Sequence, residues 1–254
     1  MKKQLKNNYN IWKYLVIIVL ILIVFNVALV ALNFEVVGVS GIVDYGPYFL
    51  QVGESTFISM VLPAVDSEGN GVTTLLNVEA SPGKGRTLTE IDNLLFWADT
   101  QHSIRIARLV ANDTSRKDVG LYDLIYSVEA DASVVGGPSA GAALAIATIA
   151  AIEGKELRND VMITGAINRD GTLGPVSEVY AKAKASADAG AKILLVPLLQ
   201  SRDVIYTTEE SCEIFGTNEI CTTETRPQKI NLTEETGIQV IEVGNVGEAL
   251  KYFY

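Results

Sequence analysis

The hexapeptide GGPSAG at residues 136–141, which runs on without a charged residue to Ile152, decides the expected fold. Glycine and proline break regular structure at its start. The continuation at residues 138–152 (PSAGAALAIATIAAI) is rich in alanine and apolar on every side, which is typical of a helix buried in a core. We therefore expect a loop that opens into the most buried helix of a folded domain. A second membrane span is the alternative for this helix, although alanine and glycine contribute little to membrane insertion.

Ser139 stands where the loop becomes the helix. Unpaired N–H groups in a first helical turn, together with the helix dipole, stabilise developing negative charge. A serine hydroxyl also needs a base, and because His102 is the single histidine, a Ser-His-Asp arrangement would depend on that residue alone. A lysine in a poorly solvated site, where its pKa is lowered, is the alternative base. The hexapeptide by itself leaves open a structural role in which its small residues only allow close packing.

Hydrophobic periodicity and turn residues predict strands that alternate with helices on both sides of this segment. The expected strands are residues 60–65, 72–80, 122–128, 161–167, 193–197 and 238–243, and the expected helices are residues 100–111, 138–152, 175–189 and 246–252. The Gly69-Asn70-Gly71 signal would join the first two strands in a hairpin, and Gly190 would end the third helix. With 254 residues and 48% hydrophobic content, the chain can bury one sizeable core. We expect one α+β (α/β-like) domain with a polar surface excursion at residues 201–236.

The N-terminal region is typical of a membrane anchor. Residues 14–32 form an uncharged apolar run long enough to cross a membrane as a helix. Lys2, Lys3, Lys6 and Lys13 precede it without an acidic residue, so residues 1–13 are expected in the cytoplasm and the remainder outside. Residues 33–58 would be a juxtamembrane segment and residues 59–254 the domain. A cleaved signal peptide is the alternative, but the apolar run is longer than usual and no A-x-A site follows.

Charge and cysteine content exclude several classes of partner. The net charge is −10 and every acidic residue follows Leu32, which argues against nucleic acid. Cys212 and Cys221 are the two cysteines, and outside the cytoplasm they would form a local disulfide. Their spacing does not suit a zinc site, and no GxxxxGK[ST] phosphate loop occurs in the 254 residues. We therefore expect no metal, nucleotide or other cofactor.

Three ordered motifs resemble those of Lon-type (S16) serine peptidases. GPSAG at residues 137–141 matches the nucleophile motif of that family. Thr164-Gly165-x-Ile167, followed by Gly171-x-x-x-Pro175 and Lys182, is similar to its second motif. The resemblance covers about residues 60–254, is closest at residues 136–197, and includes VEASPGKGR at residues 78–86. A membrane segment followed by such a domain without an ATPase resembles the archaeal membrane-anchored Lon-related peptidases.

The resemblance implies the Lon proteolytic-domain fold and a peptidase with Ser139 as nucleophile and Lys182 as general base. Thr164 would orient the lysine, and the backbone near Gly137, Pro138 and Ala140 would contribute to an oxyanion hole. The implied substrates are unfolded or flexible polypeptides, cleaved without ATP on the outer side of the membrane. An assembly of several identical copies is also implied.

Two positions depart from the family pattern. Gly136 stands where some members carry an acidic residue, and Ala166 stands where many carry glutamate. Both departures remove a polar neighbour from the predicted site. They motivate a rival hypothesis, in which the chain is a catalytically silent, membrane-tethered Lon-like binding or scaffold module.

Without the resemblance, the sequence does not select Lys182 as the base. Lys182 and Lys184 flank the same apolar face of the predicted helix 175–189, and Glu178 could form an ordinary surface ion pair with Lys182, which would raise the pKa of the lysine. We take Lys184 to be the solvated one of the two. His102, Asp92 and Asp99 are left outside the predicted site, because a lone histidine in a helix and aspartates at loops or helix caps are common structural features.

Overall fold

A computed structural model describes residues 20–22, 24, 55–90, 95–96, 98–130, 134–135, 137–215 and 218–254. The chain divides into two compact units, residues 1–50 and 51–254. In the first unit, Leu20, Ile21, Leu22 and Val24 are helical and exposed. The expected cytoplasmic segment at 1–13, the rest of the expected span at 14–32 and the juxtamembrane segment up to residue 54 lie outside the described residues. Among the residues that are described, no helix combines the length and the apolar character needed to cross a membrane.

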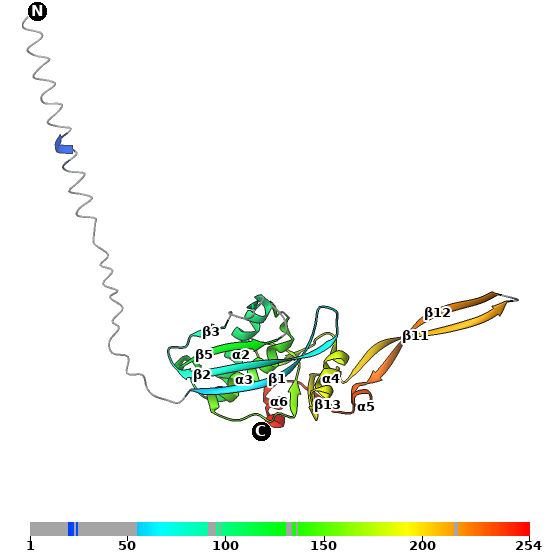
Figure 1. The fold of residues 1–254 in the computed structure, drawn as a ribbon. Helices are drawn as coiled ribbons and strands as arrows, with labels where there is room; N and C mark the ends of the chain where they lie inside the picture. Colours follow the sequence, from blue (N-terminus) through cyan, green and yellow to red (C-terminus); the bar gives the residue numbers. More distant parts are fainter. Residues whose placement is uncertain are drawn as a thin grey trace, which may run out of the picture. The chain divides into compact units, whose positions relative to one another are not determined.

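The second unit contains the expected mixture of sheets and helices (Figure 1). Its first sheet has the strand order β1-β2-β5-β3, formed by β1 (Thr56–Val65), β2 (Gly71–Pro82), β5 (Tyr122–Glu129) and β3 (Thr87–Thr89). The predicted hairpin is confirmed, with Val65 opposite Gly71 in the antiparallel β1–β2 pair. In its turn, the Asp66 carboxylate accepts from the backbone amides of Glu68 and Asn70.

The second sheet is parallel and has the order β13-β10-β7, with β7 (Val161–Ile163), β10 (Ile193–Pro197) and β13 (Gln239–Val243). The prediction of one strand over residues 161–167 was wrong in its second half. After β7 the chain leaves the sheet, and β8 (Ala166–Ile167) pairs instead with β9 (Leu173–Gly174). The break falls at Thr164 and Gly165, where the Gly165 amide donates to the Ser139 carbonyl at 2.9 Å rather than to a neighbouring strand.

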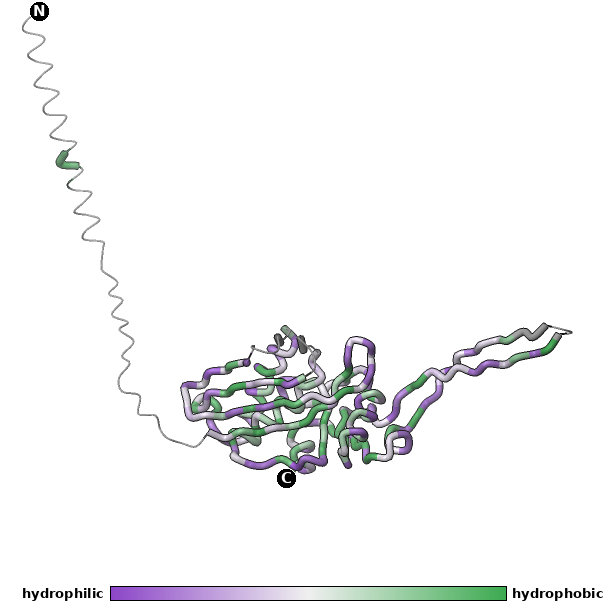
Figure 2. Tube along the Cα trace, in the orientation of Figure 1, coloured by the Kyte–Doolittle hydropathy of each residue, from purple (hydrophilic) through white to green (hydrophobic). Residues whose placement is uncertain are grey.

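Helix α3 (Gly141–Glu153) is the centre of the core, as its composition predicted. All its residues from Gly141 to Ile152 are buried. It packs against β1 and β2 on one side and against α2 (Ala98–Ser115) on the other. Figure 2 shows hydrophobic segments gathered in this region. An all-round apolar helix is therefore accommodated here by burial between a sheet and a second helix.

The shorter elements complete the domain. The short helices are η1 (Val119–Leu121), η2 (Pro138–Ala140), α4 (Val179–Asp188), α5 (Leu232–Thr236) and α6 (Val246–Phe253), and a two-stranded parallel pair joins β4 (Leu95–Phe96) to β6 (Val134–Val135). Gly190, with φ +86°, follows the end of α4, as expected. The predicted start of this helix at Pro175 was wrong, because Gln200 holds the backbone of Val176 in a non-helical conformation by bonding both its N–H and its C=O.

The polar excursion at residues 201–236 contains a long ribbon that the sequence did not predict. Strands β11 (Arg202–Phe215) and β12 (Asn218–Asn231) pair along their whole length and project from the rest of the domain (Figure 1). Cys212 lies opposite Cys221, and the structure joins them in a disulfide. A two-stranded ribbon buries little surface of its own, so this cross-link supports it near its far end.

The Gly83–Arg86 turn, part of the VEASPGKGR segment, is held by one buried carboxylate. Asp123 on β5 accepts from the amides of Lys84 and Arg86 and pairs with the Arg86 guanidinium. These interactions, led by the Arg86 hydrogen bond, lower the pKa of Asp123 to about 2. A Cβ on Gly83 would overlap the Asp123 carboxylate, so this turn needs glycine.

Candidate active site

Ser139 lies in the single turn η2 between β6 and α3. Gly137, at the N-cap of this turn, has φ +98°, which favours glycine, and Pro138 follows at the first helical position. The Ser139 carbonyl accepts from the Gly165 amide at 2.9 Å and from the Thr164 hydroxyl at 3.4 Å. The sequence therefore makes a rigid turn, and the end of β7 holds that turn by the backbone of its serine.

Most backbone amides around Ser139 are already used within the fold. The Gly137 amide donates to the Asp99 carboxylate at 2.9 Å. The Gly141 amide donates to the Pro138 carbonyl, and the Ala142 amide donates to the Gly165 carbonyl at 2.9 Å. Pro138 has no N–H, and in a 3-10 turn the amide of residue 140 faces the carbonyl three residues before it. The amide of Ser139 itself is consequently the best placed to receive a ligand oxygen.

Lys182 is buried on α4, with an exposed fraction of only 2%. Its Nζ donates to the Ser177 carbonyl at 3.0 Å. Burial lowers the pKa of Lys182, and this effect exceeds the opposing influence of the Glu178 charge, which raises it. Lys184, by contrast, is exposed, as expected. Tertiary packing thus separates two lysines that the helical periodicity could not distinguish.

The β1–β2 hairpin lies against the helix that carries Lys182. Both of its strands contact α4. A Cβ on Gly71 would overlap the Ala181 carbonyl oxygen and crowd the Ala185 side chain, so the strand approaches the helix backbone directly. The turn signal at residues 69–71 does not by itself reveal this close approach.

Thr164 follows β7 and is buried, with 1% of its surface exposed. Its hydroxyl contacts the Ser139 carbonyl, and its amide donates to the Leu195 carbonyl at 3.0 Å. The hydrogen bonds of the described residues therefore link Thr164 to the backbone of Ser139, whereas the Lys182 amine is bonded to Ser177. Orientation of the lysine by Thr164, and direct contact between Ser139 and Lys182, stay predictions.

Sequence reasoning missed two residues that shape this site. Asp99, which was left outside the site as an ordinary cap residue, bonds the loop next to Ser139. Gln200 accepts from the Val176 amide at 3.0 Å and donates to its carbonyl at 2.7 Å, next to the Ser177 carbonyl that holds Lys182. An acidic residue in a first helical turn gave a weak signal for Asp99, and no local signal marked Gln200. His102 is exposed on α2, and Asp92 and Gly136 lie outside the described residues.

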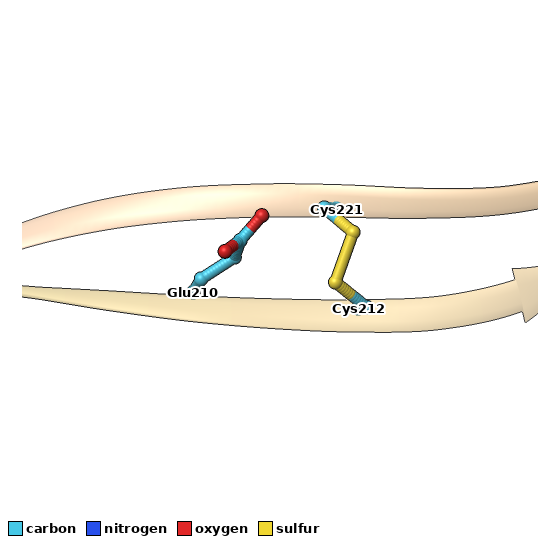
Figure 3. Close-up of side chains that lie close together, drawn as sticks. All are labelled: Glu210, Cys212 and Cys221. Atoms are coloured by element: carbon cyan, nitrogen blue, oxygen red, sulfur yellow. A yellow bond between two sulfur atoms is a disulfide. The ribbon is translucent and has the colours of Figure 1, made fainter.

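One group of potential metal ligands lies in the ribbon, away from Ser139. Glu210, Cys212 and Cys221 lie within 4.8 Å of one another (Figure 3). The two sulfur atoms are bonded to each other, whereas metal coordination by cysteine requires free thiolates. The group therefore fits a disulfide with a neighbouring carboxylate and not a metal site.

Comparison with known proteins finds similarity to one protease family. Residues 103–217 match the family model of the Lon protease (S16) C-terminal proteolytic domain. This part of the chain is similar to a Lon-type proteolytic domain. The matched region includes Ser139, Thr164 and Lys182 but begins after Asp99. The matching family model and these relatives are described as Lon proteases.

Several relatives carry the name Lon protease. "Lon protease" of Vibrio parahaemolyticus is 30% identical over 169 residues, which cover 63% of this chain and 20% of the relative. "Archaeal Lon protease" of Thermococcus kodakarensis is 28% identical over 138 residues, covering 54% of this chain and 21% of the relative. "Lon protease 1" of Herpetosiphon aurantiacus is 40% identical over 76 residues, covering 30% and 9%. The chain thus spans about a fifth or less of the length of these relatives.

Proposed function

We propose that this chain is a serine endopeptidase in which Ser139 is the nucleophile and Lys182 the general base. The observation that carries the proposal is the burial of Lys182. Burial lowers the pKa of its amine, and Nζ donates to the Ser177 carbonyl oxygen. A lysine can remove a proton from serine only when it is neutral, and desolvation favours the neutral amine. Lys184 on the same helix is exposed.

The hydrogen bond to the Ser177 carbonyl can hold the Lys182 side chain in one orientation, whether the amine is charged or neutral. A neutral amine has two N–H groups and one lone pair, so it can donate to Ser177 while its lone pair accepts the Ser139 hydroxyl. In the proposed reaction, Ser139 Oγ attacks a peptide carbonyl as its proton passes to Lys182 Nζ. The lysine then returns this proton to the leaving amine, and water releases the acyl group.

The tetrahedral intermediate needs a donor for its oxyanion. We assign the Ser139 amide, because the neighbouring amides of Gly137, Gly141 and Ala142 already donate within the fold. The hydrogen bonds from Gly165 and Thr164 to the Ser139 carbonyl hold this peptide group in place. Gly137, Pro138 and Ala140 then support the site through the shape of the turn rather than through their side chains.

The proposed substrates are unfolded or flexible polypeptides, which the relatives' name of protease supports. Because the 254 residues contain no phosphate-binding loop, we propose cleavage that does not depend on ATP. The lysines before the apolar run at residues 14–32 support an anchor with the domain on the outer side of the membrane. The Cys212–Cys221 disulfide also fits an oxidising compartment. Assembly into a homo-oligomer is part of the same proposal.

The test compares the detergent-solubilised full chain with Ser139→Ala, Lys182→Ala and Lys184→Ala on unfolded casein. We expect the first two variants to lose cleavage by at least a hundredfold and Lys184→Ala to cut like the parent. Equal loss in both lysine variants would reject Lys182 as the base. Inactivity of the parent at several pH values would favour the silent binding module, and stimulation by ATP would contradict nucleotide independence.

A further inference from the structure

Asp99 connects the start of α2 to the turn that carries Ser139. One carboxylate oxygen, Oδ1, accepts from the amide of the next residue, Thr100, at 2.7 Å. The other oxygen, Oδ2, accepts from the Gly137 amide at 2.9 Å. The second bond ties α2 to a loop two residues before the nucleophile.

The turn has a second anchor on its opposite side. The Ser139 carbonyl is bonded by the Gly165 amide and by the Thr164 hydroxyl, both at the end of β7. Gly137 has φ +98°, which favours glycine, and its carbonyl accepts from the Thr100 hydroxyl at 3.5 Å. The position of Ser139 therefore depends on hydrogen bonds at both ends of the turn.

We propose that Asp99 is a positioning residue that fixes the nucleophile turn through the Gly137 amide. This inference rests on the proposed function of Ser139. Asp99 lies before the first residue of the family match, and the neighbouring position 136 is glycine, which has no side chain to support the turn. The carboxylate on α2 supplies that support from another element. By engaging the Gly137 amide, it also leaves Ser139 as the donor to the oxyanion.

Substitution of Asp99 by asparagine and by alanine should have different effects on the turn. Asp99→Asn keeps an oxygen that can accept from Gly137, whereas Asp99→Ala removes the acceptor. Since small displacements of a reacting group can lower the rate by about a hundredfold, we expect Asp99→Ala to lower kcat by 10- to 100-fold. We expect KM to change by about twofold or less, because Asp99 acts on the turn and not on the substrate. Asp99→Asn should restore kcat to within about fivefold of the parent.

The experiment measures kcat and KM of the full chain, Asp99→Ala, Asp99→Asn and Ser139→Ala on a fluorogenic peptide. Asp113→Ala is the matched control, because Asp113 is an exposed aspartate on the same helix. Thermal unfolding of each variant separates a lost turn contact from a general loss of stability. Loss in Asp99→Ala with recovery in Asp99→Asn at similar stability supports the inference. Unchanged or increased kcat in Asp99→Ala overturns it.

Hydrogen exchange of the Gly137 amide, followed by NMR, gives a readout that does not need activity. The amide should exchange faster in Asp99→Ala than in the parent, and Asp99→Asn should be intermediate. If the parent and Ser139→Ala are equally inactive, the proposed function fails while this measurement still decides whether Asp99 holds the turn. Unchanged exchange in Asp99→Ala would reject the contact itself.

Discussion

Replacing Lys182 by methionine should abolish cleavage and, at neutral pH, raise the stability of the fold. Methionine has a similar length and no charge, so it can fill the same buried space on α4 without a desolvation cost. The substitution removes one hydrogen bond, from Nζ to the Ser177 carbonyl at 3.0 Å. The outcome depends on whether that loss exceeds the cost of burying the amine.

The two terms can be compared. The hydrogen bond contributes about 1 kcal/mol net. Burial lowers the pKa of Lys182, and each tenfold loss of proton affinity costs about 1.4 kcal/mol when the unfolded lysine is protonated. We predict that the desolvation cost of the amine exceeds the loss of this hydrogen bond. We expect the methionine variant to unfold at higher urea concentration than the parent at pH 7.

The pH dependence of unfolding tests separately whether Lys182→Met raises or lowers the stability. Between the lowered folded pKa and the ordinary value of 10.5, the unfolded chain binds a proton that the folded chain does not. The stability contributed by this group therefore rises with pH, by up to about 1.4 kcal/mol per pH unit, and is lost as the pH falls. The advantage of Lys182→Met should shrink toward alkaline pH. Urea unfolding at pH 7, 8 and 9 measures this, and Lys184→Met is the matched control, since Lys184 is exposed on the same helix. A methionine variant that is less stable than the parent by about 2 kcal/mol, with a constant difference across pH, would refute the reasoning.

Three further predictions concern the elements around the site. Glu178→Gln removes the charge that raises the pKa of Lys182, so the acidic limb of a kcat/KM profile should move to lower pH; a shift in the opposite direction would contradict the assignment. Gly71→Ala places a methyl group against the Ala181 carbonyl, so it should lower the free energy of unfolding in urea by about 1–3 kcal/mol and should also lower the rate of cleavage. The control Gly69→Ala places its methyl group in open space, so it should lower the free energy of unfolding only through the strain of its positive φ, by about 1 kcal/mol. Replacing Cys212 and Cys221 together by serine should speed cleavage of the ribbon by a glutamate-specific protease while the melting temperature of the domain changes little; a melting temperature lowered by more than about 8 °C would show that the ribbon supports the core.

The sequence predicted those elements of the fold that depend mainly on residues close together in the chain. The all-apolar composition of residues 141–152 predicted the buried helix α3, and the turn signal at residues 69–71 predicted the β1–β2 hairpin, because both depend on local periodicity and turn chemistry. GGPSAG likewise placed Ser139 at a loop-to-helix junction. The polar strands β11 and β12 were missed because most of the side chains that the structure describes in them are exposed, which leaves little hydrophobic alternation to detect.

The tertiary structure decided which groups around Ser139 have unusual chemistry. Lys182 and Lys184 have equivalent positions in the sequence pattern, yet tertiary packing buries one and leaves the other exposed. Asp99 and Gln200 bond backbone groups that are far away in the chain, and no periodicity encodes such contacts. Local sequence sets where helices and turns form, whereas the solvation of a charge and the partner of an amide depend on what the rest of the chain brings beside them.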